Sequence, residues 1–78
     1  IEVNKQEASK YYKMAADRGH AESMYMYANQ LHEGDGIPSN LKEAVKYYKM
    51  AIDKGNESAM NDYAKILYKG QEIDQNKE

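Results

Sequence analysis

The side chains best suited to metal binding or proton transfer in this 78-residue sequence are two histidines and scattered carboxylates. His20 and His32 are the only histidines, and neither stands four residues from a second metal-ligating type. Glu33 and Asp35 lie near His32, but adjacent positions do not share one face of a helix. No Ser-His-Asp set or carboxylate pair stands out. We therefore expect no catalytic residue, no metal and no cofactor, in a chain that is not an enzyme.

A short glycine-rich segment is the one place where a phosphate group could be considered. Gly34-Asp35-Gly36 lacks the strand before it and the Lys-Ser/Thr after it that a phosphate-binding loop requires. The segment is therefore interpreted as a loop between two helices.

Composition restricts the function further. The chain carries 11 basic and 13 acidic residues, and the net charge of −2 gives no field that attracts phosphates, so we expect no nucleic-acid partner. It contains no Cys, which excludes disulfides and Cys-based zinc sites. No apolar run is long enough for a membrane span, so we expect no membrane insertion. The compartment is left open, although the lack of Cys and of a visible signal peptide favours the cytoplasm.

The sequence repeats itself after 36 residues. The segment Ala8-Ser-Lys-Tyr-Tyr-Lys-Met-Ala15 aligns with Ala44-Val-Lys-Tyr-Tyr-Lys-Met-Ala51, and identities continue on both sides of this block. Self-similarity at this period is typical of solenoid proteins, in which each repeat packs against its neighbours.

Apolar residues within each unit recur at helical spacing, and glycines separate the segments. Asn4 and Asn40 each precede such a segment with a Glu three residues later, a pattern that begins helices. Gly34 and Gly55 are expected to end helices, and Ile37 to anchor the intervening loop. The expected helices lie near 4–18, 21–33, 41–54 and 57–69, with 70–78 as a frayed tail or the start of a truncated helix. We predict one all-α domain over residues 1–78, an α/α superhelical solenoid of antiparallel helix hairpins with roughly two repeats.

The helices expected at 21–33 and 57–69 carry an apolar stripe that is identical in the two copies, and beside it a face whose residues differ between the copies. Met24, Tyr27, Ala28 and Leu31 recur as Met60, Tyr63, Ala64 and Leu67, and we expect this stripe to pack. Tyr12 and Tyr48 are also expected to pack rather than to bind a ligand. The variable face comprises three positions at helical spacing and their copies, none of which keeps its residue type. These partner-binding candidates are Tyr25, Asn29, His32, Asn61, Lys65 and Tyr68.

The order of these features resembles the Sel-one-like repeat (SLR) family, a relative of the tetratricopeptide repeat. The residues that carry the resemblance are Ala28, Leu31, Gly34, Gly36-Ile37-Pro38, Asn40, Lys42-Glu43-Ala44, Tyr47-Tyr48, Lys49, Ala51 and Gly55. A Tyr pair stands where the family often has Trp-Tyr, and the second loop, Gln71-Glu72-Ile73-Asp74, lacks the second Gly and the Pro.

The resemblance implies an adaptor or scaffold that binds a peptide or protein on the face of the first helix of each repeat. A bacterial branch with Cys pairs has been linked to β-lactam chemistry, and a cell-wall-type hydrolase is the corresponding enzyme alternative; no residue of this Cys-free chain supports it. A structural segment without its own ligand is the other alternative. Both ends of the sequence fall inside the repeat pattern, so we expect apolar surface on the outer helices and possible self-association of the isolated chain.

Overall fold

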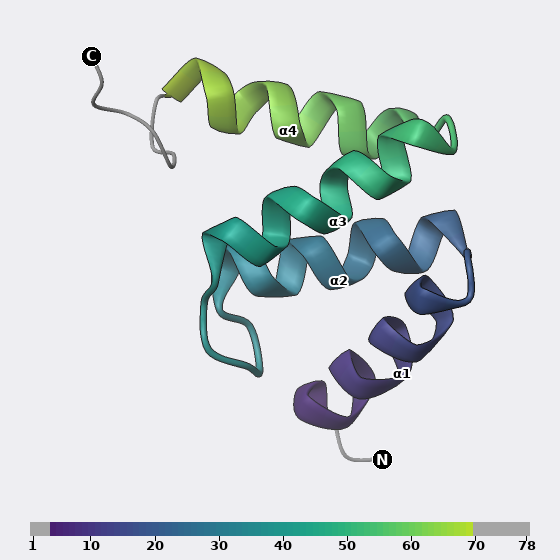
Figure 1. The fold of residues 1–78 in the computed structure, drawn as a ribbon. Coiled ribbons are helices and arrows are strands. Elements are labelled where there is room, and N and C mark those ends of the chain that lie inside the picture. Colours follow the sequence, from purple (N-terminus) through teal and green to yellow (C-terminus); the bar gives the residue numbers. More distant parts are fainter. Residues whose placement is uncertain (1–3, 70–78) are drawn as a thin grey trace.

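The computed structural model describes residues 4–69, which form four α-helices and no strand (Figure 1). The helices are α1 (Lys5–Asp17), α2 (Ala21–Glu33), α3 (Leu41–Asp53) and α4 (Glu57–Lys69). Consecutive helices pack against each other as antiparallel neighbours, and this confirms the predicted all-α repeat fold. The prediction for residues 70–78 lies outside the described residues.

The helices begin at polar caps. The side chains of Asn4, Asn40 and Asn56 each accept a hydrogen bond from the backbone amide three residues later, at 2.9, 3.1 and 2.8 Å. The caps predicted at Asn4 and Asn40 are confirmed. At the start of α2 the same role falls to His20, whose Nδ1 accepts from the backbone amide of Ser23 at 3.2 Å. Each cap satisfies a backbone donor that the helix itself leaves free.

The loop between α2 and α3 depends on two glycines with positive φ. Gly34 (φ 69°) ends α2, as predicted, and Gly36 has φ 88°. A Cβ on Gly36 would lie only 2.5 Å from the Cβ of Lys5, so the loop passes too close to α1 for any side chain at this point. Ile37 packs against the core, which confirms its predicted role as an anchor.

Small and aromatic residues share the core. Ala28, Ala44 and Ala51 are fully buried and allow the helix axes to approach closely. Tyr48 and Tyr47 are 1% and 2% exposed. The packing of Tyr48 was predicted from the sequence, whereas that of Tyr47 was not. Tyr47 is buried because α3 also contacts α1: the Tyr47 hydroxyl donates to Asp17 at 2.9 Å, at the end of α1.

The two outer helices leave apolar side chains uncovered, as the repeat pattern predicted. Met60 and Leu67 on α4 are 42% and 58% exposed, and Tyr11 on α1 is 58% exposed. The prediction that the whole stripe of α4 packs is wrong, because no helix within residues 4–69 covers its outer side. The buried side of α4 instead presents Ala59 and Ile66 to the rest of the molecule.

None of the helices in the described part of the chain is long and apolar enough to cross a membrane.

Candidate partner-binding site

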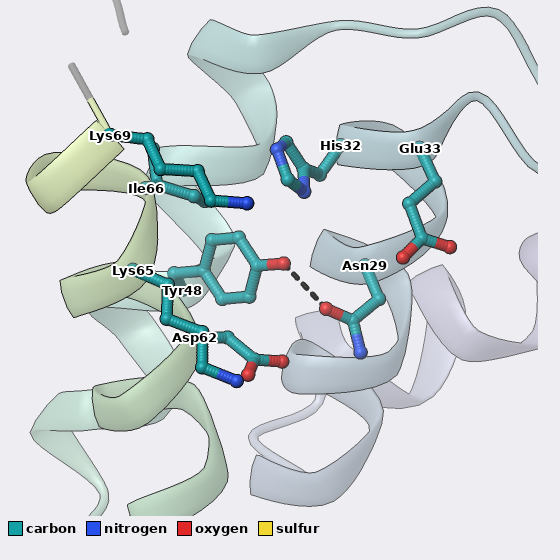
Figure 2. Close-up of a pocket in the computed structure, with 8 residues that line it drawn as sticks. All are labelled: Asn29, His32, Glu33, Tyr48, Asp62, Lys65, Ile66 and Lys69. Atoms are coloured by element: carbon teal, nitrogen blue, oxygen red, sulfur yellow. Dashed lines mark hydrogen bonds between the residues drawn. The ribbon is translucent and has the colours of Figure 1, made fainter. Parts of the chain in front are cut away.

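The candidate site is a pocket of about 170 Å³ between α2 and α4, with α3 behind it (Figure 2). It therefore joins the first helices of two successive repeat units. Its lining residues come from α2 (Asn29, His32 and Glu33), from α3 (Tyr48) and from α4 (Asp62, Lys65, Ile66 and Lys69).

Tyr48 forms the floor of the pocket. Its hydroxyl donates a hydrogen bond to Oδ1 of Asn29 (Figure 2). The ring centroids of Tyr25 and Tyr63 each lie 6.4 Å from the centroid of Tyr48, and the imidazole of His32 lies 6.5 Å away, edge-on. Aromatic pairs at these separations attract each other. Groups from both α2 and α4 thus hold Tyr48 in place.

A second hydrogen bond joins α2 to α4 beside the pocket. The hydroxyl of Tyr25 donates to Oδ2 of Asp62 at 2.8 Å. The amide of Asn29 acts to lower the pKa of Tyr25, but burial and the Asp62 carboxylate outweigh it, so this pKa is raised. Burial, assisted by the charge of Asp62, also raises the pKa of Tyr48. Both hydroxyls therefore remain protonated at neutral pH and act as donors.

Four charged side chains surround the pocket: Glu33, Asp62, Lys65 and Lys69. Within residues 4–69, none of them belongs to an ion pair. Glu33 stands on α2 and the two lysines stand on α4, on the opposite side of the pocket (Figure 2). The α4 side of the pocket thus offers two cationic donors beside the Asp62 carboxylate, which accepts from Tyr25, and the α2 side offers the Glu33 carboxylate, above an aromatic floor.

Four of the six residues singled out from the sequence meet at this site. Asn29, His32 and Lys65 line the pocket, and Tyr25 adjoins it through its contacts with Tyr48 and Asp62.

The remaining two, Asn61 and Tyr68, lie on α4 outside the pocket, and the side chain of Tyr68 is 92% exposed. They are the copies of Tyr25 and His32. Successive repeats follow one another along the stack in the same orientation, so equivalent side chains face the same way. The positions of Tyr25 and His32, which face α4, therefore correspond to positions of α4 that face away from α2, whereas Asn29 and its copy Lys65 both reach the pocket.

Sequence reasoning missed the lining residues Glu33, Tyr48, Asp62, Ile66 and Lys69. Tyr48 was assigned to packing alone. For α4, a signal was present: the positions of Met26, Gln30 and Glu33 in α2 become Asp62, Ile66 and Lys69. These three positions also change residue type between the copies, and they lie on the side of α4 that faces α2.

The described residues contain no group of three or more His, Cys, Asp and Glu side chains that could hold a metal ion. The lining of the pocket contains no Ser, Thr or Cys nucleophile. Its chemistry is that of hydrogen bonding, charge and aromatic contact.

The Sel1 repeat family model matches the chain in three segments, residues 1–20, 21–56 and 57–78. The same comparisons found no match among curated proteins or solved structures. The middle segment holds α2 and α3, while the flanking segments hold α1 and α4. The pocket therefore lies where the complete unit meets the following one. With the matched segments extending over the whole sequence, the chain belongs to the Sel1 repeat family.

Proposed function

We propose that this chain binds a peptide or protein segment in the pocket between α2 and α4. The observation that carries the proposal is a set of charged side chains around an aromatic floor, without ion-pair partners in residues 4–69. Sel1 repeats are generally modules for protein–protein interaction and are typically non-catalytic scaffolds. Membership of the family and the chemistry of the pocket therefore support the same kind of function.

The size of the pocket favours a side chain of a peptide over a free metabolite. Its volume of about 170 Å³ is below the roughly 300–1,000 Å³ of most small-molecule sites. A peptide could insert one side chain between Asn29 and Ile66 and continue along the surface of α2 and α4. Extended concave surfaces are the usual binding surfaces of helical solenoids.

The charges indicate the chemistry of the partner. Lys65 and Lys69 on α4 suit a carboxylate of the partner, and Glu33 on α2 suits an amide or cationic group. Because the net charge of the chain is −2, we favour a polar peptide over nucleic acid.

Selection from a displayed random-peptide library, followed by calorimetric titration of an enriched peptide, tests the proposal. Lys65→Ala and Asn29→Ala should each weaken binding about tenfold or more, because each removes a polar group that lines the pocket. Lys42→Ala is the matched control, since Lys42 is an exposed lysine of α3 outside the pocket. Peptides that bind both pocket variants as tightly as the wild type would refute the proposal.

A further inference from the structure

We propose that α1 of one copy of this chain packs on the outer face of α4 of another copy, and that it repeats the internal contact between α2 and α3. The outer face of α4 is defined as Met60, Tyr63, Ala64 and Leu67. This contact would make the chain assemble head to tail, through a face of α4 that contributes no lining residue to the peptide pocket.

The outer face of α4 has a covered counterpart in the same molecule. Met24, Ala28 and Leu31 of α2 are 3%, 0% and 5% exposed. Their copies on the outer face are of identical residue types, yet Met60 and Leu67 are 42% and 58% exposed. Since α2 packs against α3 and α4 lacks such a neighbour within residues 4–69, a helix resembling α3 is the natural cover for this face.

Helix α1 is the second copy of α3 in this sequence. Both contain Ala-x-Lys-Tyr-Tyr-Lys-Met-Ala at the same place in the unit. The two copies differ in exposure, because Tyr47 of α3 is 2% exposed whereas its copy Tyr11 of α1 is 58% exposed. Helix α3 packs against both α2 and α4, whereas α1 packs mainly against α2, so α1 is the copy with a free face.

The internal contact also supplies a pairing for particular residues. Tyr27 of α2 and Tyr47 of α3 meet edge-on with ring centroids 4.9 Å apart. Their copies are Tyr63 of α4 and Tyr11 of α1. In the proposed assembly these two rings come from different copies and form the equivalent edge-on pair. In the internal contact, His32 of α2 also lies edge-on to Tyr48 of α3, with ring centroids 6.5 Å apart. In the proposed assembly the exposed Tyr68 takes the place of His32, beside Tyr12 of the other copy.

The proposed contact joins two different surfaces, so it leaves α1 free on one copy and α4 free on the other. Such a heterologous contact adds copies without closing unless the rotation happens to form a ring. Because the described ion pairs involve no pair between α2 and α3, the equivalent contact between copies should depend little on salt.

Sedimentation velocity of the 78-residue chain from micromolar to millimolar concentration is the test, with Leu67→Glu and Tyr11→Lys as interface variants. Both side chains are largely exposed in one copy, so the helices should persist, as circular dichroism would check. The wild type should form species beyond the dimer as concentration rises. Each variant alone should weaken association at least about tenfold, because it buries a charge at the contact. Lys49→Glu, an exposed position of α3, is the control and should associate like the wild type.

Mixing the two variants distinguishes the proposed contact from other modes of association. The Leu67→Glu chain keeps an intact α1, and the Tyr11→Lys chain keeps an intact α4. One good contact can therefore form, and the mixture should yield a one-to-one complex that grows no further. A monomeric wild type at all concentrations would overturn the proposal. So would association that survives Tyr11→Lys but not Leu67→Glu, because that result indicates pairing of α4 with α4.

Discussion

Exchanging the buried polar pair between α1 and α2 for the apolar pair of the next unit would test how these helices are held together. Ser9 is 3% exposed and Gln30 is 8% exposed, and the Ser9 hydroxyl donates to Oε1 of Gln30 at 2.7 Å. The copies of these residues are Val45 on α3 and Ile66 on α4. The same place in the repeat therefore accepts a hydrogen-bonded pair in one unit and apolar side chains in the next.

The single substitutions should cost more than the double one. Ser9→Val leaves Oε1 of Gln30 buried without its donor, a loss of about 1–3 kcal/mol, against which the added methyl groups return about 1 kcal/mol. Gln30→Ile should cost less, because the freed hydroxyl of Ser9 can turn to a backbone carbonyl one helical turn earlier and the lost contacts of Nε2 to the carbonyls of Lys5 and Asp35 are long, at 3.5 and 3.4 Å. The double variant buries two apolar side chains and removes both ends of the bond between Ser9 and Gln30. The carbonyls of Lys5 and Asp35 lose only the long contacts from Nε2 of Gln30, at 3.5 and 3.4 Å, so its free energy of unfolding should stay close to that of the wild type.

Urea unfolding followed by far-ultraviolet circular dichroism, at a concentration where the chain is monomeric, measures this cycle. The expected coupling between the two sites is about 1–2 kcal/mol, or a difference of several degrees in Tm. Gln6→Ile and Ser58→Val, at exposed positions of α1 and α4, make the matched control pair and should be additive. If the Ser9 and Gln30 substitutions are additive within about 0.5 kcal/mol, the hydrogen bond does not link the two helices energetically.

Three further predictions concern the loop, a cap and a titration. Gly36→Ala should lower the free energy of unfolding by more than about 1 kcal/mol in urea titrations, because φ is positive and the new Cβ would collide with Lys5. Asn40→Ala should cost about 1 kcal/mol in the same assay, while Asn40→Asp keeps the cap and most of the stability. Burial and the hydrogen bond to Asp17 raise the pKa of Tyr47 from 10.0 to about 12. Its neutral form stabilises the fold below pH 10, so the free energy of unfolding should fall between pH 10 and 12 by up to about 1.4 kcal/mol per pH unit. Tyr47→Phe should lack this part of the decline when both proteins are unfolded at each pH.

Much of the fold follows from local sequence features. Asn4 and Asn40 mark the starts of α1 and α3 because a short polar side chain can satisfy a free backbone amide wherever a helix begins. Gly34 marks the end of α2 because the left-handed backbone favours glycine. The repeat period predicted stacked hairpins because identical apolar stripes need identical neighbours. These features depend on a few adjacent residues or on the repeat itself, so they are visible without the tertiary structure.

The burial of particular side chains depended on packing that the periodicity does not contain. The burial of Tyr47 on α3 involves both the ring of Tyr27 and the carboxylate of Asp17, which come from two other helices. Leu67 has the residue type of a core position, but its exposure is set by which helices are adjacent to α4. His20 caps α2 through a ring nitrogen, a role that its residue type does not predict.

The geometry of the candidate site has a consequence for how such repeats should be compared. A pocket between the first helices of two units uses the side of one helix that faces the next unit and the side of the other helix that faces the previous unit. Here the side of α2 that faces α4 contributes His32, and the side of α4 that faces α2 contributes Asp62 and Ile66. Equivalent positions can also meet in one pocket, because Asn29 and its copy Lys65, and Glu33 and its copy Lys69, all line it, whereas Tyr68, the copy of His32, does not. The residues that one ligand would touch are therefore found by taking the side of α2 that faces α4 together with the side of α4 that faces α2. None of these positions belongs to the apolar stripe of either helix, so the pocket can change its residue types without altering that stripe.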